Sequence, residues 1–186
     1  MFNLASFLKK ERELCDCSYI DVLFHSLEDW KDFKQLAMTF FGKASGLSKK
    51  FIHCSLKVSI GNDENDPHQR LYDFTDRGIM SYETGRRRVK AIIRFYFDHN
   101  QGISDCLNRI SQISRTVSPL DWGQAIPILK GEEPESLVCT TFILHALPFD
   151  LPTNYQTPDE LFDFLCEKKE TIKKVDGMRD VALYLE

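Results

Sequence analysis

The sequence predicts an α+β fold in which an antiparallel β-sheet packs against helices. Two observations favour it. Apolar, β-branched segments bounded by turn residues are typical of strands, and other segments repeat apolar residues at helical spacing. The chain has 186 residues, a length at which about two-thirds of the unfolded surface can be buried. We therefore expect a single domain over residues 1–186, with a helical extension over 1–17 and a core over 18–165.

The first part of the chain is predicted to alternate between helix and strand. Residues 2–14 favour a short amphipathic helix, and SYIDVLFHS over 18–26 favours a strand. A second helix is predicted over 27–46, because its apolar residues recur at i, i+3 and i+4 and mark one buried face. These residues are Trp30, Phe33, Leu36, Ala37, Phe40 and Phe41.

Three further strands are predicted over 50–60, 70–76 and 89–97. A polar turn that begins at Gly61 separates the first two, and Gly78 is expected to break the second. We expect these three strands to form an antiparallel meander, since consecutive strands usually pair.

Helices dominate the rest of the predicted structure. Residues 103–117 repeat isoleucine and leucine at helical spacing. Residues 118–136 are predicted to be a loop, because five proline and glycine residues interrupt them. A short apolar helix is expected to begin at Cys139.

The end of the chain carries a clear helix start. Thr157 is a good N-cap residue and Pro158 suits the first turn, so a helix is predicted over 157–169. The tail over 179–186 favours a last strand.

Charge and hydropathy limit the classes of function. The formal net charge is −4, which argues against a nucleic-acid-binding protein. The dense basic cluster Arg86–Arg88 is expected to be a solvated turn, with contact to an anionic partner as the alternative. We see no secretory signal and no stretch near the ~18 apolar residues of a spanning helix. We therefore expect a cytoplasmic protein (in the host cell, if the chain is viral) with reduced thiols.

The six cysteines do not have the spacing of a structural zinc site. Cys15 and Cys17 form one C-x-C pair without a second pair at suitable spacing. Cys54 neighbours His53, but adjacent residues of a strand point to opposite faces. We therefore expect no metal and no organic cofactor.

Cys139, His53 and Asp73 are the candidate catalytic residues. A thiol nucleophile needs a lowered pKa, a base and a group that orients the base. Cys139 stands at a predicted helix N-terminus, which stabilises a thiolate and offers N–H groups to an oxyanion. His53 and Asp73 lie 20 residues apart on neighbouring predicted strands, so they can face each other.

Each of these residues also has a structural interpretation, which spacing alone favours. A single histidine in a strand is more often structural, and a cysteine in an apolar helix is usually a small hydrophobic residue. Asp73 could cap a turn with Arg77. The other histidines are poorer candidates by position; these are His25, His68, His99 and His145.

The order of several short motifs resembles the circularly permuted papain-like thiol enzymes related to NlpC. This group includes the YiiX/YaeF-like bacterial proteins and lecithin:retinol acyltransferase. The similar segments cover about residues 18–165. In order they are IDVLF (20–24), KFIHCSLKVSIG (50–61), LYDFTDRGI (71–79), CTTFI (139–143) and TPDELFDF (157–164). Cys54 departs from the small apolar residue that usually follows the histidine, and Asp73 is shorter than the frequent glutamate.

The resemblance implies a cysteine hydrolase of the peptidase or amidase type, acting on a peptide-like or acyl-lipid substrate. Cys139 would be the nucleophile, His53 the base and Asp73 the orienting residue. One alternative is a catalytically silent binding module on the same fold. Another is a lipid acyltransferase or thioesterase that uses MFNLASFLKK (1–10) as an interfacial anchor.

Trp122 and Tyr19 are candidate substrate-binding residues. Trp122 lies in the long predicted loop before the nucleophile, and loops of more than ~12 residues in compact domains are often functional. Core packing is the alternative for both aromatic residues, and we favour it.

Overall fold

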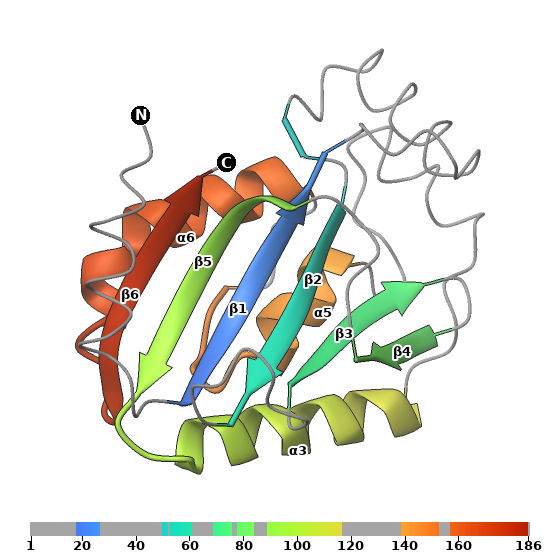
Figure 1. The fold of residues 1–186 in the computed structure, drawn as a ribbon, viewed down its shortest axis with the longest axis horizontal. Helices are drawn as coiled ribbons and strands as arrows, with labels where there is room; N and C mark the ends of the chain where they lie inside the picture. Colours follow the sequence, from blue (N-terminus) through green and yellow to red (C-terminus); the bar gives the residue numbers. More distant parts are fainter. Residues whose placement is uncertain are drawn as a thin grey trace.

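The described residues form an antiparallel β-sheet of six strands, and the described helices pack on one face of it. The structure, a computed structural model, describes residues 18–26, 50–51, 53–60, 69–75, 78–83, 89–116, 139–152 and 157–185. The strands are β1 (Ser18–His25), β2 (His53–Ser59), β3 (Arg70–Thr75), β4 (Gly78–Tyr82), β5 (Val89–Phe97) and β6 (Met178–Leu185). Their order in the sheet is β4-β3-β2-β1-β5-β6, and all neighbours are antiparallel (Figure 1). The predicted α+β class and antiparallel sheet are therefore confirmed.

The predicted meander is wrong in its third strand. β3 ends at Thr75, before the predicted break at Gly78. A further strand, β4, begins at Gly78 and pairs back on β3, with Thr75 opposite Gly78. Its φ of 90° lies in the left-handed region that glycine adopts without strain. The segment over 89–97 is instead β5, between β1 and β6. Its five consecutive buried residues at 93–97 suit an inner strand covered on both faces.

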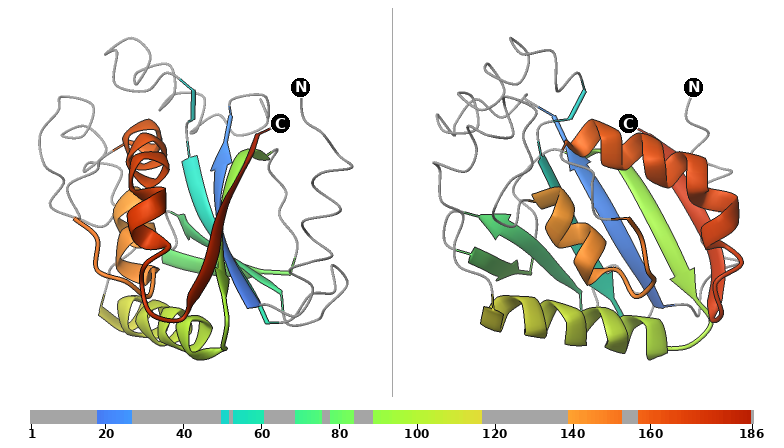
Figure 2. Two further views of the ribbon diagram at one scale, coloured as in Figure 1. Left: turned by 90° about the vertical axis from the view of Figure 1, so that its left-hand side faces the viewer. Right: turned by 180° about the vertical axis from the view of Figure 1, so that it is seen from behind.

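Three helices are described: α3 (Gln101–Thr116), α5 (Cys139–Ala146) and α6 (Pro158–Ile172). Figure 2 shows that all three lie on the same side of the sheet. The predicted start of α6 is confirmed, because the Thr157 hydroxyl accepts from the Glu160 N–H and the Glu160 carboxylate accepts from the Thr157 N–H. The predicted helices over 2–14 and 27–46 and the loop over 118–136 lie outside the described residues.

The main core lies between the sheet and these helices. Alternate residues of β1 and β2 point into it, as the twofold period of a strand requires. They are Ile20, Val22 and Phe24 from β1, with Cys54, Leu56 and Val58 from β2. The intervening residues point to the opposite face, where Tyr19, Tyr96 and Ala182 form a separate buried cluster. Within the described ranges, no helix has the length and apolar character needed to cross a bilayer.

Candidate active site

The candidate site lies where β3 separates from β2. The two strands pair from Val58 opposite Arg70 to Leu56 opposite Tyr72. Beyond that point β3 leans away from β2, and α5 is seen between them (Figure 1). His53, the first residue of β2, and Asp73, in the middle of β3, both belong to this diverging end.

His53 and Asp73 are in direct contact. Nε2 of His53 shares a hydrogen bond with Oδ1 of Asp73. The two residues are only 9% and 7% exposed, so their charges are shielded little by water. The carboxylate therefore holds one nitrogen of the ring, which leaves Nδ1 for a second partner.

Cys139 is brought to this pair by the packing of α5. The helix is strongly apolar, and Phe142 is fully buried. The ring of Phe142 stacks on that of Phe74, the residue after Asp73, with centroids 6.2 Å apart. This contact places the first turn of α5 beside β3, where the partly exposed Cys139 hydrogen-bonds His53. The structure thus brings Cys139, His53 and Asp73 together.

Cys54 is a second partner of the Cys139 sulfur. Both the thiol and the backbone N–H of Cys54 hydrogen-bond to it. A backbone N–H lies in the plane of its sheet, so the sulfur lies at the edge of β2. From an edge position, side chains of both faces are within reach. This explains how His53 and Cys54, which are consecutive, both contact Cys139.

These contacts shift the pKa values of both Cys139 and His53. The hydrogen bond from the Cys54 thiol is the largest influence on the pKa of Cys139. Although burial opposes it, the charge and hydrogen bond of His53 act in the same direction, and the pKa of Cys139 falls well below its ordinary value. Burial alone would lower the pKa of His53, but the charges and hydrogen bonds of Asp73 and Cys139 raise it to about 9. Both shifts favour a thiolate at Cys139 beside an imidazolium at His53.

The other described thiols have raised pKa values. Burial raises the pKa of Cys106 in α3 to about 12. Burial also raises the pKa of Cys166 in α6. Burial is the first cause of the raised pKa of Cys54 too, followed by the contact with Cys139. Among the described cysteines, Cys139 is therefore the one whose pKa is lowered.

Two neighbouring contacts support the histidine. The ring of His25 stacks on that of His53, with centroids 5.8 Å apart, and its Nε2 lies 2.7 Å from the Ser55 hydroxyl. Asp159 in the first turn of α6 accepts a hydrogen bond from the Lys50 N–H at 3.0 Å, close to where β2 begins. Both contacts fix the start of the strand that carries His53.

Sequence reasoning missed Cys54 and His25 as members of the site. The sequence carries a signal for Cys54, which directly follows the candidate base. His25 is identified only by the β1–β2 register, in which it lies opposite His53. The strand alternation used to separate Cys54 from His53 is correct, but it does not account for a partner at the strand edge.

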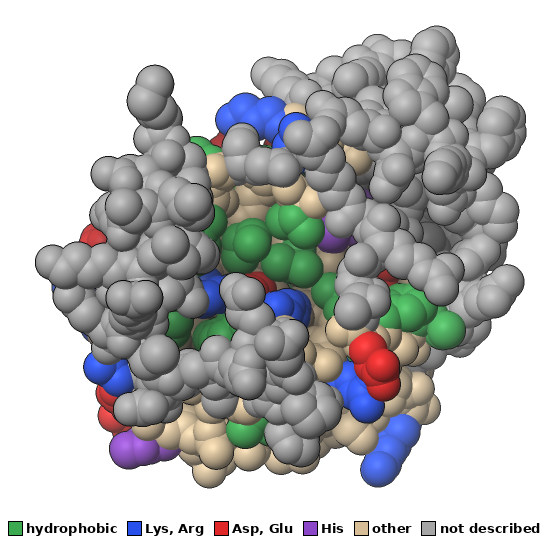
Figure 3. Space-filling view, in the orientation of Figure 1, with side chains coloured by type: hydrophobic (Ala, Val, Ile, Leu, Met, Phe, Trp, Pro, Cys, Tyr) green, Lys and Arg blue, Asp and Glu red, His purple; other side chains and the backbone are tan. Residues whose placement is uncertain are grey.

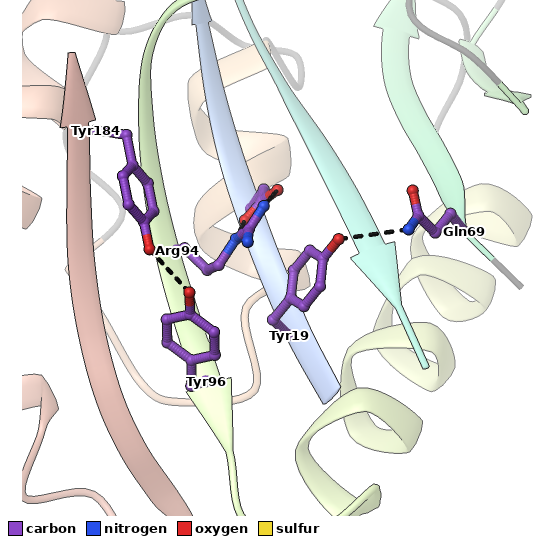
Figure 4. Close-up of polar contacts among 6 residues, drawn as sticks. Tyr19, Gln69, Arg94, Tyr96 and Tyr184 are labelled. Carbon is purple, nitrogen blue, oxygen red and sulfur yellow. Dashed lines mark hydrogen bonds and ion pairs between the residues drawn. The ribbon is translucent and has the colours of Figure 1, made fainter. Parts of the chain in front are cut away.

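Tyr19 is not brought to this site. It lies opposite Ser59, six residues along β1 from His25, or roughly 20 Å at the usual rise of a strand. There it packs with Tyr96 in the buried cluster on the other face of the sheet and lies beneath the Arg94 guanidinium (Figure 4). Trp122 lies outside the described residues.

No group of three or more His, Cys, Asp and Glu side chains is arranged to hold a metal ion in the described part of the chain. The donor and acceptor groups at Cys139 instead suit transfer of a proton and attack by sulfur. A comparison with known protein families, with curated proteins and with solved structures finds no match for this chain.

Proposed function

We propose that the protein is a cysteine hydrolase of the peptidase or amidase type, on a circularly permuted papain-like fold. The observation that carries the proposal is the chain of hydrogen bonds from Cys139 to His53 and from His53 to Asp73. A thiol, an imidazole and a carboxylate in this order match the roles of nucleophile, base and orienting group.

The first half of the reaction forms an acyl-enzyme. The Cys139 thiolate attacks the carbonyl carbon of an amide, and the carbonyl oxygen becomes an oxyanion. The N–H of Cys139 at the start of α5 is the proposed donor to that oxyanion. The His53 imidazolium then gives its proton to the leaving nitrogen, so that the C–N bond breaks and a thioester remains.

The second half releases the acyl group. His53, now neutral, takes a proton from water, and the resulting hydroxide attacks the thioester carbonyl. The C–S bond breaks, the carboxylic acid leaves and the Cys139 thiolate pairs again with protonated His53. Throughout, Asp73 holds Nε2 of His53, so that the other ring nitrogen stays directed at the sulfur.

The low pKa of Cys139 favours this class over a silent binding module. A module without chemistry gains nothing from a thiolate, which is costly to keep in a largely buried site. Amides are the proposed substrates because a protonated His53 serves their poor leaving group. Activated esters and thioesters should react by the same acyl-enzyme step.

Acylation by p-nitrophenyl acetate tests the proposal. We expect a burst of nitrophenol equal to the enzyme concentration, with one acetyl group on Cys139 by peptide mass spectrometry. Cys139→Ala should lose the burst, whereas Cys106→Ala should keep it, since Cys106 is fully buried in α3. Acetylation of Cys139 no faster than in the urea-unfolded chain would identify the fold as a silent binding module.

A further inference from the structure

The two sulfur atoms of Cys54 and Cys139 form an arrangement that the hydrolytic reaction does not require. Cys54 has no exposed surface, whereas Cys139 is partly exposed. The Cys54 thiol nevertheless hydrogen-bonds the Cys139 sulfur directly. Of the two residues, Cys139 is therefore the more accessible to a small solute.

The backbones of the two residues are held in this relation by independent packing. Cys54 lies opposite Phe24 in the ladder between β1 and β2. Cys139 begins α5, which is fixed by the stacking of Phe142 on Phe74. A disulfide requires Cα atoms roughly 4.4–6.8 Å apart. The direct interaction of the two sulfur atoms across the adjoining elements β2 and α5 favours such an approach.

We propose that Cys139 is a site of reversible oxidation by hydrogen peroxide and that Cys54 is its resolving thiol. Peroxide would oxidise Cys139 to a sulfenic acid, and Cys54 would convert it to a Cys54–Cys139 disulfide. The proposal rests on the nucleophilic character of Cys139 and not on the hydrolysis of any substrate.

The chemical steps balance within the site. The Cys139 thiolate attacks one oxygen of hydrogen peroxide, the O–O bond breaks, and the hydroxide that leaves takes the proton of His53 to become water. The sulfur has then lost two electrons and carries a hydroxyl group. The Cys54 sulfur attacks it, the S–O bond breaks, and the thiol proton leaves with the hydroxyl group as a second water. A dithiol reverses the change by thiol–disulfide exchange.

This disulfide would inactivate the hydrolase and protect it at the same time. The nucleophile is blocked while it is bonded to Cys54. However, it cannot proceed to the sulfinic acid, from which thiols do not restore a cysteine. The neighbouring His53 keeps Cys139 as the thiolate that peroxide oxidises.

Peroxide treatment of the full-length protein, followed by thiol blocking in denaturant and peptide mass spectrometry, tests the proposal. We expect a linked peptide that joins Cys54 to Cys139 and the loss of two free thiols. Dithiothreitol should restore both thiols and the acylation burst. The mapping uses the wild-type chain, so it does not depend on the folding of any variant.

Two variants sharpen the experiment, each compared with its own untreated sample. After peroxide treatment, the Cys54→Ser variant should accumulate Cys139 sulfinic acid. The fraction of its acylation activity that dithiothreitol restores should be at least about tenfold smaller than the fraction restored in the wild type. Cys106→Ser should behave as the wild type, because Cys106 is buried in α3.

A wild-type protein whose Cys139 reaches the sulfinic acid while Cys54 stays a free thiol would overturn the proposal. A disulfide that joins any other pair of cysteines would overturn it too. Acetylation of Cys139 is measured separately, so failure of the redox proposal and failure of the hydrolase proposal give different results.

Discussion

Two buried clusters on the same sheet pair a cation with an aspartate. In one, Arg94 of β5 donates to Asp21 of β1 with Nε–Oδ1 and Nη2–Oδ2 distances of 2.6 and 3.0 Å. In the other, His53 of β2 bonds Asp73 of β3. Arg94 and His53 are each 9% exposed. Both clusters therefore bury a cation that is hydrogen-bonded to an aspartate.

The clusters differ in what surrounds the cation. Arg94 lies over Tyr19, 3.9 Å from the ring centroid (Figure 4). It also lies close to the rings of Tyr96 and Tyr184, whose hydroxyl groups hydrogen-bond each other. Apolar and charged side chains are visible together at the centre of this face in Figure 3. Burial alone would lower the pKa of Arg94, but the charge and hydrogen bonds of Asp21 raise it above its ordinary value. Arg94 therefore stays protonated at any ordinary pH.

His53 has a titratable partner on its other side. Cys139 and His53 can share and exchange one proton, and Cys139 is a partly exposed residue. The comparison teaches that a buried ion pair does not by itself indicate chemistry. A third group that can lose a proton and reach a substrate separates the candidate site from the structural one.

The largest expected effect is that of Cys139→Ala. Removal of the nucleophile should lower the rate of acylation roughly 10⁴-fold or more. Steady-state and burst kinetics with p-nitrophenyl acetate measure it, with Cys106→Ala as the matched thiol control. Retention of more than a tenth of the wild-type rate would mean that another group carries the reaction.

Asp21→Ala tests the second cluster. It leaves the Arg94 guanidinium buried without its carboxylate, and we expect the free energy of unfolding to fall by about 3–5 kcal/mol. Urea denaturation measures this change, and the alkylation rate of Cys139 in the folded protein should stay within about twofold of the wild type. Replacing both partners together, Asp21→Leu with Arg94→Met, should recover most of the loss. A cost below about 1 kcal/mol for Asp21→Ala would show that water replaces the carboxylate, and the comparison would fail.

Asp73→Asn should weaken catalysis without removing it. The amide cannot stabilise the imidazolium, so acylation should slow by at least about 10²-fold. Amide hydrolysis needs protonated His53, so the wild-type rate should decline as the pH rises through about 9. Loss of the Asp73 charge lowers the pKa of His53, and the decline should move to lower pH in the variant. An unchanged pH profile would exclude Asp73 as the orienting residue.

The smallest expected effect is that of Cys54→Ala on the acidity of Cys139. Loss of the thiol hydrogen bond raises the pKa of Cys139. At a pH below the pKa of Cys139 in both proteins, its alkylation by iodoacetamide should slow by up to about tenfold, the factor for one pKa unit. Cys54→Ser keeps a hydroxyl donor and should restore much of the rate. Equal rates in the wild type, the alanine variant and the serine variant would contradict a role for this contact.

Much of the fold was predictable because its signals are local. The strands at β1, β2 and β5 and the cap at Thr157 follow from composition, period and turn residues. The order of the strands in the sheet was not predictable, because the partner of a strand depends on packing with distant segments. Thus the segment at 89–97 was recognised as a strand but placed beside β3 instead of between β1 and β6.

The candidate site was likewise predictable in part. Cys139, His53 and Asp73 were selected by residue type, order and resemblance, and they lie together in the structure. The contact of Cys54 with Cys139 was not predicted, because strand alternation assigns Cys54 to the face away from His53. Only the divergence of β3 from β2, a property of the whole sheet, lets one sulfur reach both residues.

The pH dependence of alkylation tests the central claim most directly. Each cysteine of the native protein would be labelled by iodoacetamide from about pH 5 to 9 and its rate read by peptide mass spectrometry. If Cys139 is a thiolate held by His53, it should react faster than Cys106 and Cys166, and its rate near pH 6 should be close to that near pH 8. An ordinary thiol would gain about 100-fold over the same interval. Such a gain at Cys139, or a rate no higher than that of Cys106, would contradict the account.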